Sequence, residues 1–334
     1  MLPWERILDE TNEFKKFTPV DGSSCFDKTS QYFEVESVQV LIQLIGYVKY
    51  IFQRWDLSHE CKQRAVYFRG QTEHHSSICS LALADASLSP SLFRDLTGKD
   101  IIKNIKSRIQ KLKNFINKNE ELFLDKGRRS QYRFAYSAIL QQYGMSTDWL
   151  DLVDNIWSAL WFASHNVLQG KKMRGVNTDK FLLFEKSKKK YSYIYCMSFS
   201  GLTAVPEEPG CVVEQSGSPV DMKIIDLRLS VPSIYLRPHA QHGLMIKRKI
   251  FDNCHDLSNT LSDIADYKDH LILALRIRTE KVLEWLGKSS LVDYNFFFPS
   301  PLSDDGYRRL LSKFRQRENG GYTHYLGHIA HIYG

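Results

Sequence analysis

The chain has 334 residues, of which 43% are hydrophobic and 25% charged, and it carries a formal net charge of +7. This composition is typical of a globular protein that can bury a sizeable core, so folding does not require disulfides or metal ions. The six cysteines form no CxxC pair and no apolar run reaches the roughly 18 residues that cross a membrane, which argues against a zinc ribbon, a redox dithiol and a membrane-spanning protein. Scattered cysteines and a charged N-terminus predict a cytoplasmic protein without a membrane partner.

In chain order, the first half is dominated by helices. Apolar residues at helical spacing predict four of them, over residues 35–55, 99–124, 130–144 and 155–168. One aromatic run, over residues 64–70, predicts a strand between the first two helices. The second of these helices has an apolar stripe that should be buried, made of Ile101, Ile105, Ile109, Leu112 and Ile116.

Beyond residue 180 the pattern changes to strands. Apolar and β-branched runs predict five of them, over residues 181–186, 191–199, 222–227, 243–249 and 270–278. Two short helices are expected over residues 279–290 and 304–317. The sequence therefore predicts an α+β fold, in which a helix-rich N-terminal half packs on a mixed sheet, continuous or split, that the first strand joins.

The same pattern predicts three regions along the chain. Residues 1–59 form an N-terminal helical extension, residues 60–250 the main domain, and residues 251–334 a strand–helix tail that completes the same globule. Basic residues gather in two zones, and residues 103–129 carry nine Lys or Arg against three acids. Such zones attract nucleic acid or a nucleotide pyrophosphate when they lie on one face, and are otherwise solvated helix surface.

Four segments carry the chemistry of interest. They read YFRGQ at 67–71, LSPSLFR at 88–94, LQQYGMSTDWLDLVDNIWSALWFASH at 140–165, and RPHAQHGLMI at 237–246. As an ordered set they resemble the FRG domain, a bacterial and phage family named after its Phe-Arg-Gly motif. The resemblance covers about residues 60–250, and residues 297–311 resemble the tail segment found after many FRG domains. It implies a defence- or toxin-type effector.

The chain departs from the family pattern in the third segment. Asp148 stands where the family has an arginine, and the tryptophan that follows the family aspartate is missing after Asp151. Thr147 and Asp151 keep their places. A site that depends on the charge of the missing arginine is therefore altered here.

The residue types in these segments suit nucleotide binding. Arg69 offers a planar fork of donors for phosphate or carboxylate, and Gln71, Gln141, Thr147 and His239 offer polar contacts beside it. ADP-ribosyltransferases bind NAD across a split sheet with a similar order of residues. The comparison with them is an analogy that rests on the order of these residues along the fold alone. In that hypothesis Arg69 holds the pyrophosphate, Tyr143 stacks on nicotinamide and Gln241 steadies the ribose.

Two further interpretations stay open. Asp151 either activates a hydroxyl in such a site or forms a structural ion pair with Arg69, with Gln71 and Gln241 completing its hydrogen bonds. Alternatively, the arginine-centred cleft binds a nucleotide or nucleic-acid end without catalysis, and the basic helix adds salt-dependent affinity.

The sequence thus favours an effector with an NAD-binding cleft that cleaves NAD or transfers ADP-ribose to a protein or nucleic acid. The catalytic candidates are Arg69, Tyr143, Asp151 and Gln241. No Gly-rich phosphate loop and no nucleophile elbow accompany them. No metal site is expected, although His324, His328 and His331 share one face if the C-terminus is helical.

Overall fold

The structure is a computed structural model of the chain. It describes the following residues: 26–27, 32–56, 63–74, 101–120, 132–144, 147–169, 182–215, 221–249, 267, 270–287, 293–300 and 302–314. The segment LSPSLFR and the three C-terminal histidines lie outside these residues.

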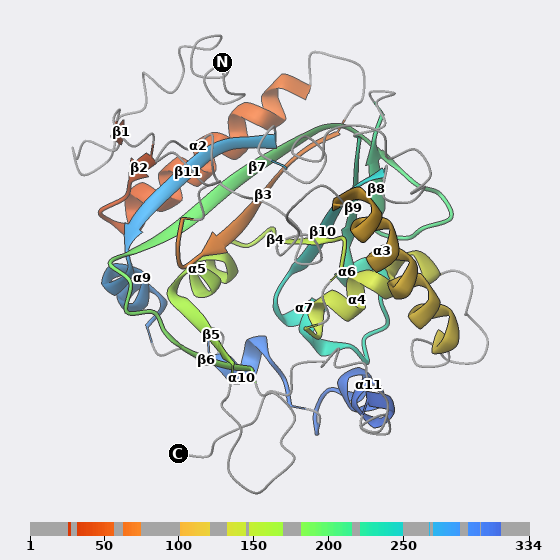
Figure 1. The fold of residues 1–334 in the computed structure, drawn as a ribbon. Helices are drawn as coiled ribbons and strands as arrows, with labels where there is room; N and C mark the ends of the chain where they lie inside the picture. Colours follow the sequence, from red (N-terminus) through yellow and green to blue (C-terminus); the bar gives the residue numbers. More distant parts are fainter. Residues whose placement is uncertain are drawn as a thin grey trace, which may run out of the picture.

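Six antiparallel strands close into a barrel (Figure 1). In ring order they are β3 (Gln63–Gln71), β4 (Leu150–Val153), β10 (Gly243–Arg248), β9 (Met222–Asp226), β8 (Cys211–Glu214) and β7 (Tyr191–Ala204). The ring closes because the end of β7 pairs with β8, where Leu202 lies opposite Glu214 and Ala204 opposite Val212.

Further strands extend the sheet from the barrel. β7 spans 14 residues. One edge of β7 pairs with β11 (Leu271–Arg278) along its first half and with β8 near its end. Next to β11 lie β2 (Tyr32–Glu34) and then β1 (Phe26–Asp27). A separate hairpin is formed by β5 (His165–Gln169) and β6 (Leu182–Lys186).

The predicted fold class is therefore wrong. Helices do not form a half of their own on an open or split sheet, because the sheet closes through the β7–β8 pairing. Two short strands that were not predicted make this closure possible: β4 links β3 to β10, and β8 links β9 to β7. The closed ring also removes the split between sheets on which the ADP-ribosyltransferase comparison depended.

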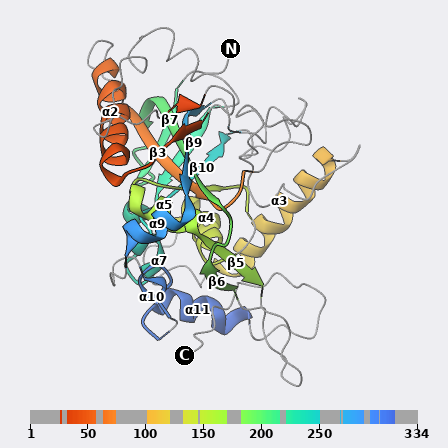
Figure 2. The ribbon, with the colours of Figure 1, turned by 90° about the vertical axis from the view of Figure 1, so that its left-hand side faces the viewer.

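The helices cover two sides of the barrel (Figures 1 and 2). The helices of the structure are α2 (Val38–Asp56), α3 (Ile101–Lys118), the 3-10 helix η4 (Arg133–Ala135), α4 (Tyr136–Gln142), α5 (Ile156–Ser164), α6 (Leu227–Ser230), α7 (Leu236–Ala240), α9 (Thr279–Leu286), α10 (Tyr294–Phe297) and α11 (Asp305–Phe314). α2, α5 and α9 share one hydrophobic core with the outer side of β3 and β7, and α3, α4 and α11 share a second.

Side-chain alternation along the strands separates these cores from the barrel interior. On β3, Val66 and Phe68 point to the core with α2 and α5, whereas Ala65 and Tyr67 pack against the interior cluster. The interior holds buried apolar and aromatic side chains from β4, β7, β9 and β10: Leu150, Leu152, Tyr195, Met197, Phe199, Met222, Ile224, Leu244 and Ile246. Because Arg69 follows Tyr67 by two positions, it shares the interior side of β3.

The central helix α5 ends earlier than predicted. Ser164 Oγ donates to the carbonyl oxygens of Leu160 at 2.9 Å and Trp161 at 3.2 Å, and His165 then adopts extended backbone. This local bonding ends the helix and starts β5, whose partner β6 completes the hairpin. The predicted helix over residues 155–168 is therefore correct for its first part and wrong after Ser164.

His165 should make the protein sensitive to mild acid. Its ring stacks on Trp161 with centroids 4.3 Å apart. Burial, which disfavours the charged ring, lowers the pKa of His165 below 6.5. The folded state therefore binds fewer protons than the unfolded chain, and this group's contribution to stability is present above pH 6.5 and is lost as the pH falls below it.

We expect the difference in unfolding free energy between wild type and His165→Asn to shrink or reverse between pH 7.5 and pH 5. Urea unfolding at the two pH values measures this difference. Asparagine is chosen because its amide can still donate to the Trp161 carbonyl, which His165 Nδ1 contacts at 2.9 Å. A difference that does not change with pH would show that the imidazole does not titrate in this window.

Candidate functional site

Arg69 holds the main chain of a neighbouring strand. Its Nη1 donates to the carbonyl oxygen of Asp151, 2.6 Å away. β3 and β4 share one paired position, Phe68 with Val153, so the side chain adds a second connection at the shortest pairing of the ring. Arg69 therefore helps to hold β4 against β3.

Asp151, whose carbonyl oxygen binds Arg69, also belongs to a small polar network. The Asp151 carboxylate accepts from Gln141 Nε2 at 2.9 Å, and Gln141 Oε1 accepts from Thr147 Oγ1 at 2.8 Å. Thr147 Oγ1 in turn accepts from the backbone N–H of Trp149 at 3.2 Å. Four of the predicted site residues thus lie together, and they fix the turn between α4 and β4.

Tyr143 and Gln241 lie elsewhere and are buried. The Tyr143 hydroxyl donates to Asp304 Oδ2 at 2.6 Å, and burial raises its pKa well above 10. Gln241 Nε2 donates to the carbonyl oxygen of Phe297 at 2.7 Å, and its residue is 5% exposed. Both side chains are engaged in holding the C-terminal segments onto the barrel.

The last two predicted residues do not join the Arg69 network among the described contacts. Gln71 is the final residue of β3 and pairs with Tyr193 of β7. His239 belongs to α7 and is half-buried, and burial lowers its pKa. The predicted set therefore divides into one network of four residues and four residues at separate places.

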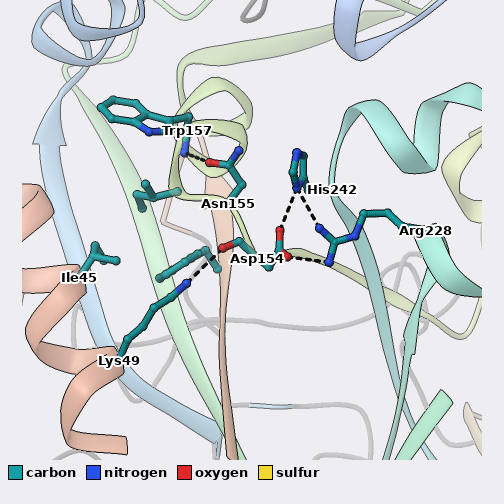
Figure 3. A pocket seen from close by; sticks show the side chains of 9 residues that line it. Ile45, Lys49, Asp154, Asn155, Trp157, Arg228 and His242 are labelled. Atoms are coloured by element: carbon teal, nitrogen blue, oxygen red, sulfur yellow. Dashed lines mark hydrogen bonds and ion pairs between the residues drawn. The ribbon is translucent and has the colours of Figure 1, made fainter. Parts of the chain in front are cut away.

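A cleft of about 350 Å³ opens beside Phe68, whose side chain points away from the barrel interior (Figure 3). Its wall comes from α2, β3, the start of α5, α6 and the residue before β10. The lining residues are Ile45, Lys49, Phe68, Asp154, Asn155, Ile156, Trp157, Arg228 and His242. Segments nearly 200 positions apart along the chain therefore meet at one cavity.

Arg228 organises the charged wall of this cleft. It binds Asp226 through Nε at 3.0 Å and Nη2 at 2.7 Å, and Nη2 also lies 2.6 Å from Asp154 Oδ2. Hydrogen bonding to Asp226, together with both nearby carboxylates, raises the pKa of Arg228. The arginine is thus held permanently charged and in one orientation.

His242 completes the cluster. Its Nδ1 lies 3.0 Å from Arg228 Nη1 and 3.2 Å from Asp154 Oδ1. A neutral ring with its proton on Nε2 accepts from Arg228, whereas a protonated ring donates to Asp154. His242 also has a backbone φ of 54°, in the left-handed region that residues other than glycine rarely adopt.

The opposite wall is aromatic, aliphatic and cationic. Lys49 Nζ lies 5.2 Å from the centroid of the Phe68 ring and donates weakly to the Asp154 carbonyl oxygen at 3.4 Å. Among the described residues, no carboxylate lies within ion-pair distance of Lys49. Asn155 Oδ1 accepts from the Trp157 N–H at 2.9 Å, which caps α5 and fixes the start of the helix beside the cleft.

No predicted site residue lines this cleft. The sequence does contain partial signals: a lysine inside the apolar helix at Lys49, an Asp-Asn pair at 154–155 before the central helix, and a histidine–glycine pair at 242–243. Each is weak alone, because nothing in the local pattern shows that the segments meet.

Residues 64–172 match the family model of the FRG domain. The resemblance to the FRG domain is therefore confirmed over these residues. No curated protein and no solved structure matches the chain significantly. The matched residues include the Arg69 network and the Asp154–Trp157 wall of the cleft, while Arg228 and His242 lie beyond them.

Two other properties of the described residues bear on function. None of their helices is both long and apolar enough to cross a membrane. They also contain no group of three His, Cys, Asp or Glu side chains arranged to hold a metal ion.

Proposed function

We propose that the FRG domain of this chain is a binding module for a mononucleotide, held in the cleft between Lys49 and Arg228 without being cleaved. The observation that carries the proposal is a cavity with one aromatic wall and a lysine that has no carboxylate partner among the described residues. Small-molecule sites combine apolar walls with a few convergent polar groups in this way.

Different side chains of the cleft suit different parts of a nucleotide. Trp157, Ile45 and Ile156 offer apolar surface on which a base can stack. Lys49 supplies N–H donors and a positive charge for the phosphate, and His242 offers a ring nitrogen on the opposite wall (Figure 3). The Arg228 charge is already balanced by Asp226 and Asp154, so its role is to position His242 and the carboxylates.

The size of the cleft favours one nucleotide unit. At about 350 Å³ it lies near the lower end of the roughly 300–1,000 Å³ range of small-molecule sites, so a dinucleotide such as NAD would extend beyond it. The reading in which NAD is cleaved also requires Tyr143 and Gln241 to reach the ligand, and both side chains are buried and bonded to other groups. Binding without catalysis is therefore the function that the geometry favours.

The backbone of His242 gives independent support. A left-handed non-glycine residue such as His242 costs of order 1–3 kcal/mol, and such residues cluster at functional sites. Here the conformation places the ring against Arg228 and Asp154 at the edge of the cleft. Gly243 follows directly, and a Cβ there would lie 3.0 Å from Gln142 Nε2, which keeps the turn tight.

Calorimetric titration with adenosine 5′-monophosphate and with adenosine tests the proposal. We expect saturable binding of the monophosphate, and at least tenfold weaker binding after Lys49→Gln, because a charge-assisted hydrogen bond of about 1.5–3 kcal/mol is lost. Adenosine should bind wild type and Lys49→Gln equally. Lys188→Gln, an exposed lysine outside the cleft, is the matched control and should leave the affinity unchanged.

Three outcomes would contradict the proposal. One is the absence of binding to any of the four common ribonucleoside monophosphates, and another is equal weakening in Lys49→Gln and Lys188→Gln. The third is release of nicotinamide during incubation with NAD, which would support the catalytic interpretation instead.

A further inference from the structure

The helix α3 has an unusual charge distribution. Its 18 residues include six basic side chains and no Asp or Glu: Lys103, Lys106, Arg108, Lys111, Lys113 and Lys118. The net charge of the entire chain is +7, so this helix carries a large share of the excess.

Packing fixes which side of α3 faces solvent. Ile109, Leu112 and Ile116 are at most 8% exposed and join the core that contains α4. These positions recur at helical spacing, so they form one stripe, and the basic residues occupy the remaining arc. Figure 2 shows α3 at the periphery of the molecule, with one end extending away from the barrel strands.

The cations on this arc are regularly spaced. Lys106 and Lys113, and likewise Lys111 and Lys118, are seven residues apart, which is nearly two turns or about 10 Å along the helix. Lys103, Lys111 and Lys118 are exposed, and no carboxylate of the described residues forms an ion pair with any of them. The nearby Glu120 is bound to Arg133, at 3.2 Å.

We propose that the basic arc of α3 binds the phosphate backbone of a nucleic-acid duplex, without reading its sequence. Such binding needs clustered Lys and Arg on one face, and the arc provides this. The apolar stripe is buried against α4, so it is not available for insertion into a membrane. The aromatic residue of α3, Phe115, packs partly buried against the same core, so the arc lacks a stacking platform for single strands.

The test is the salt dependence of binding to a 20-base-pair DNA duplex of mixed sequence, followed by fluorescence anisotropy. We compare wild type with Lys103→Gln/Lys111→Gln/Lys118→Gln. Each neutralised phosphate contributes about 0.9 to the slope of log K against log salt, so removal of three contacts should reduce the slope by roughly 2.7. At 50 mM salt we expect at least a tenfold loss of affinity.

Two matched variants serve as controls. The same three positions changed to arginine keep the charge and should keep the slope. Lys186→Gln/Lys188→Gln/Lys190→Gln removes three exposed lysines from the last residue of β6 and the turn that leads to β7, where the Lys190 carbonyl accepts from the first residue of α9. Because α9 lies on the opposite side of the molecule from α3 in Figure 1, this variant should bind DNA like wild type.

The proposal is overturned if the wild-type slope is flat, or if the two glutamine variants weaken binding equally. Binding to phosphatidylserine vesicles without binding to the duplex would also overturn it, as would a preference for single-stranded over duplex DNA. These results leave the cleft untouched, because none of the substituted lysines lines it.

Discussion

Replacing Gly70 with alanine should destabilise the protein by about 3 kcal/mol or more, or prevent it from folding. A Cβ at this position would lie 1.9 Å from the carbonyl oxygen of Ala159 and 2.8 Å from the backbone nitrogen of Ala163. Both atoms belong to the backbone of α5, so no side chain can rotate away. The strand and the helix would have to separate, which would open the core between them.

Urea unfolding of Gly70→Ala and wild type measures this cost. Gly46→Ala is the matched control, because Gly46 lies in α2 and nothing is within 4 Å of a Cβ built there. Alanine is preferred over glycine within a helix by up to about 1 kcal/mol, so this control should be as stable as wild type or slightly more stable. If Gly70→Ala unfolds at the same urea concentration as wild type, the close approach of α5 to β3 does not exist in solution.

Asp304→Ala should cost about 3–5 kcal/mol. Asp304 is fully buried and accepts from the Tyr143 hydroxyl at 2.6 Å, from the Tyr307 N–H at 2.9 Å and from the Leu236 N–H at 3.3 Å. Alanine would leave these donors without an acceptor. It would also remove a negative charge near Arg237, a fully buried guanidinium 4.1 Å from the Tyr307 ring and 4.6 Å from the Tyr143 ring.

The neighbouring Asp305 provides the control for this substitution. Its side chain is half exposed and pairs with Arg308 on the surface of α11. Such pairs contribute about 0–1 kcal/mol, so Asp305→Ala should unfold close to wild type. Equal losses for both variants would mean that α11 depends on the charge of its first turn and that the buried contacts of Asp304 contribute little.

Long periodic segments were predictable from the sequence. The helix α2 and the strand β3 follow from their apolar spacing, and Ile109, Leu112 and Ile116 are buried as the stripe in α3 requires. Periodicity reports which face of an element is covered, and that information is local. It therefore fixes these elements without knowledge of their partners.

The closure of the barrel was not predictable in the same way. β4 and β8 have four residues each, too few to show a clear alternation, and β4 lies among polar residues that resemble a loop. Their place in the sheet depends on partners far along the chain, such as Leu152 opposite Leu244. Local sequence patterns carry no information about such pairings.

The candidate site residues show the same difference between what local patterns predict and what tertiary contacts create. Arg69, Gln141, Thr147 and Asp151 were expected near one another from motif order, and they form one network. The cleft, in contrast, is created by the meeting of α2, α5 and α6, so Lys49 and Arg228 acquire a shared role through tertiary contacts alone. A lysine in an apolar helix is ordinarily a surface residue.

The barrel also bears on how the FRG match should be understood. The matched residues 64–172 contain two of the six barrel strands, β3 and β4, while the remaining four come from residues 191–248. A fragment cut at residue 172 would lack β7 and β10, and so would expose the edge of β3 that pairs with β7 and the edge of β4 that pairs with β10. The boundary of detectable similarity is therefore not a boundary of autonomous folding, and work on excised FRG segments needs the downstream strands as well.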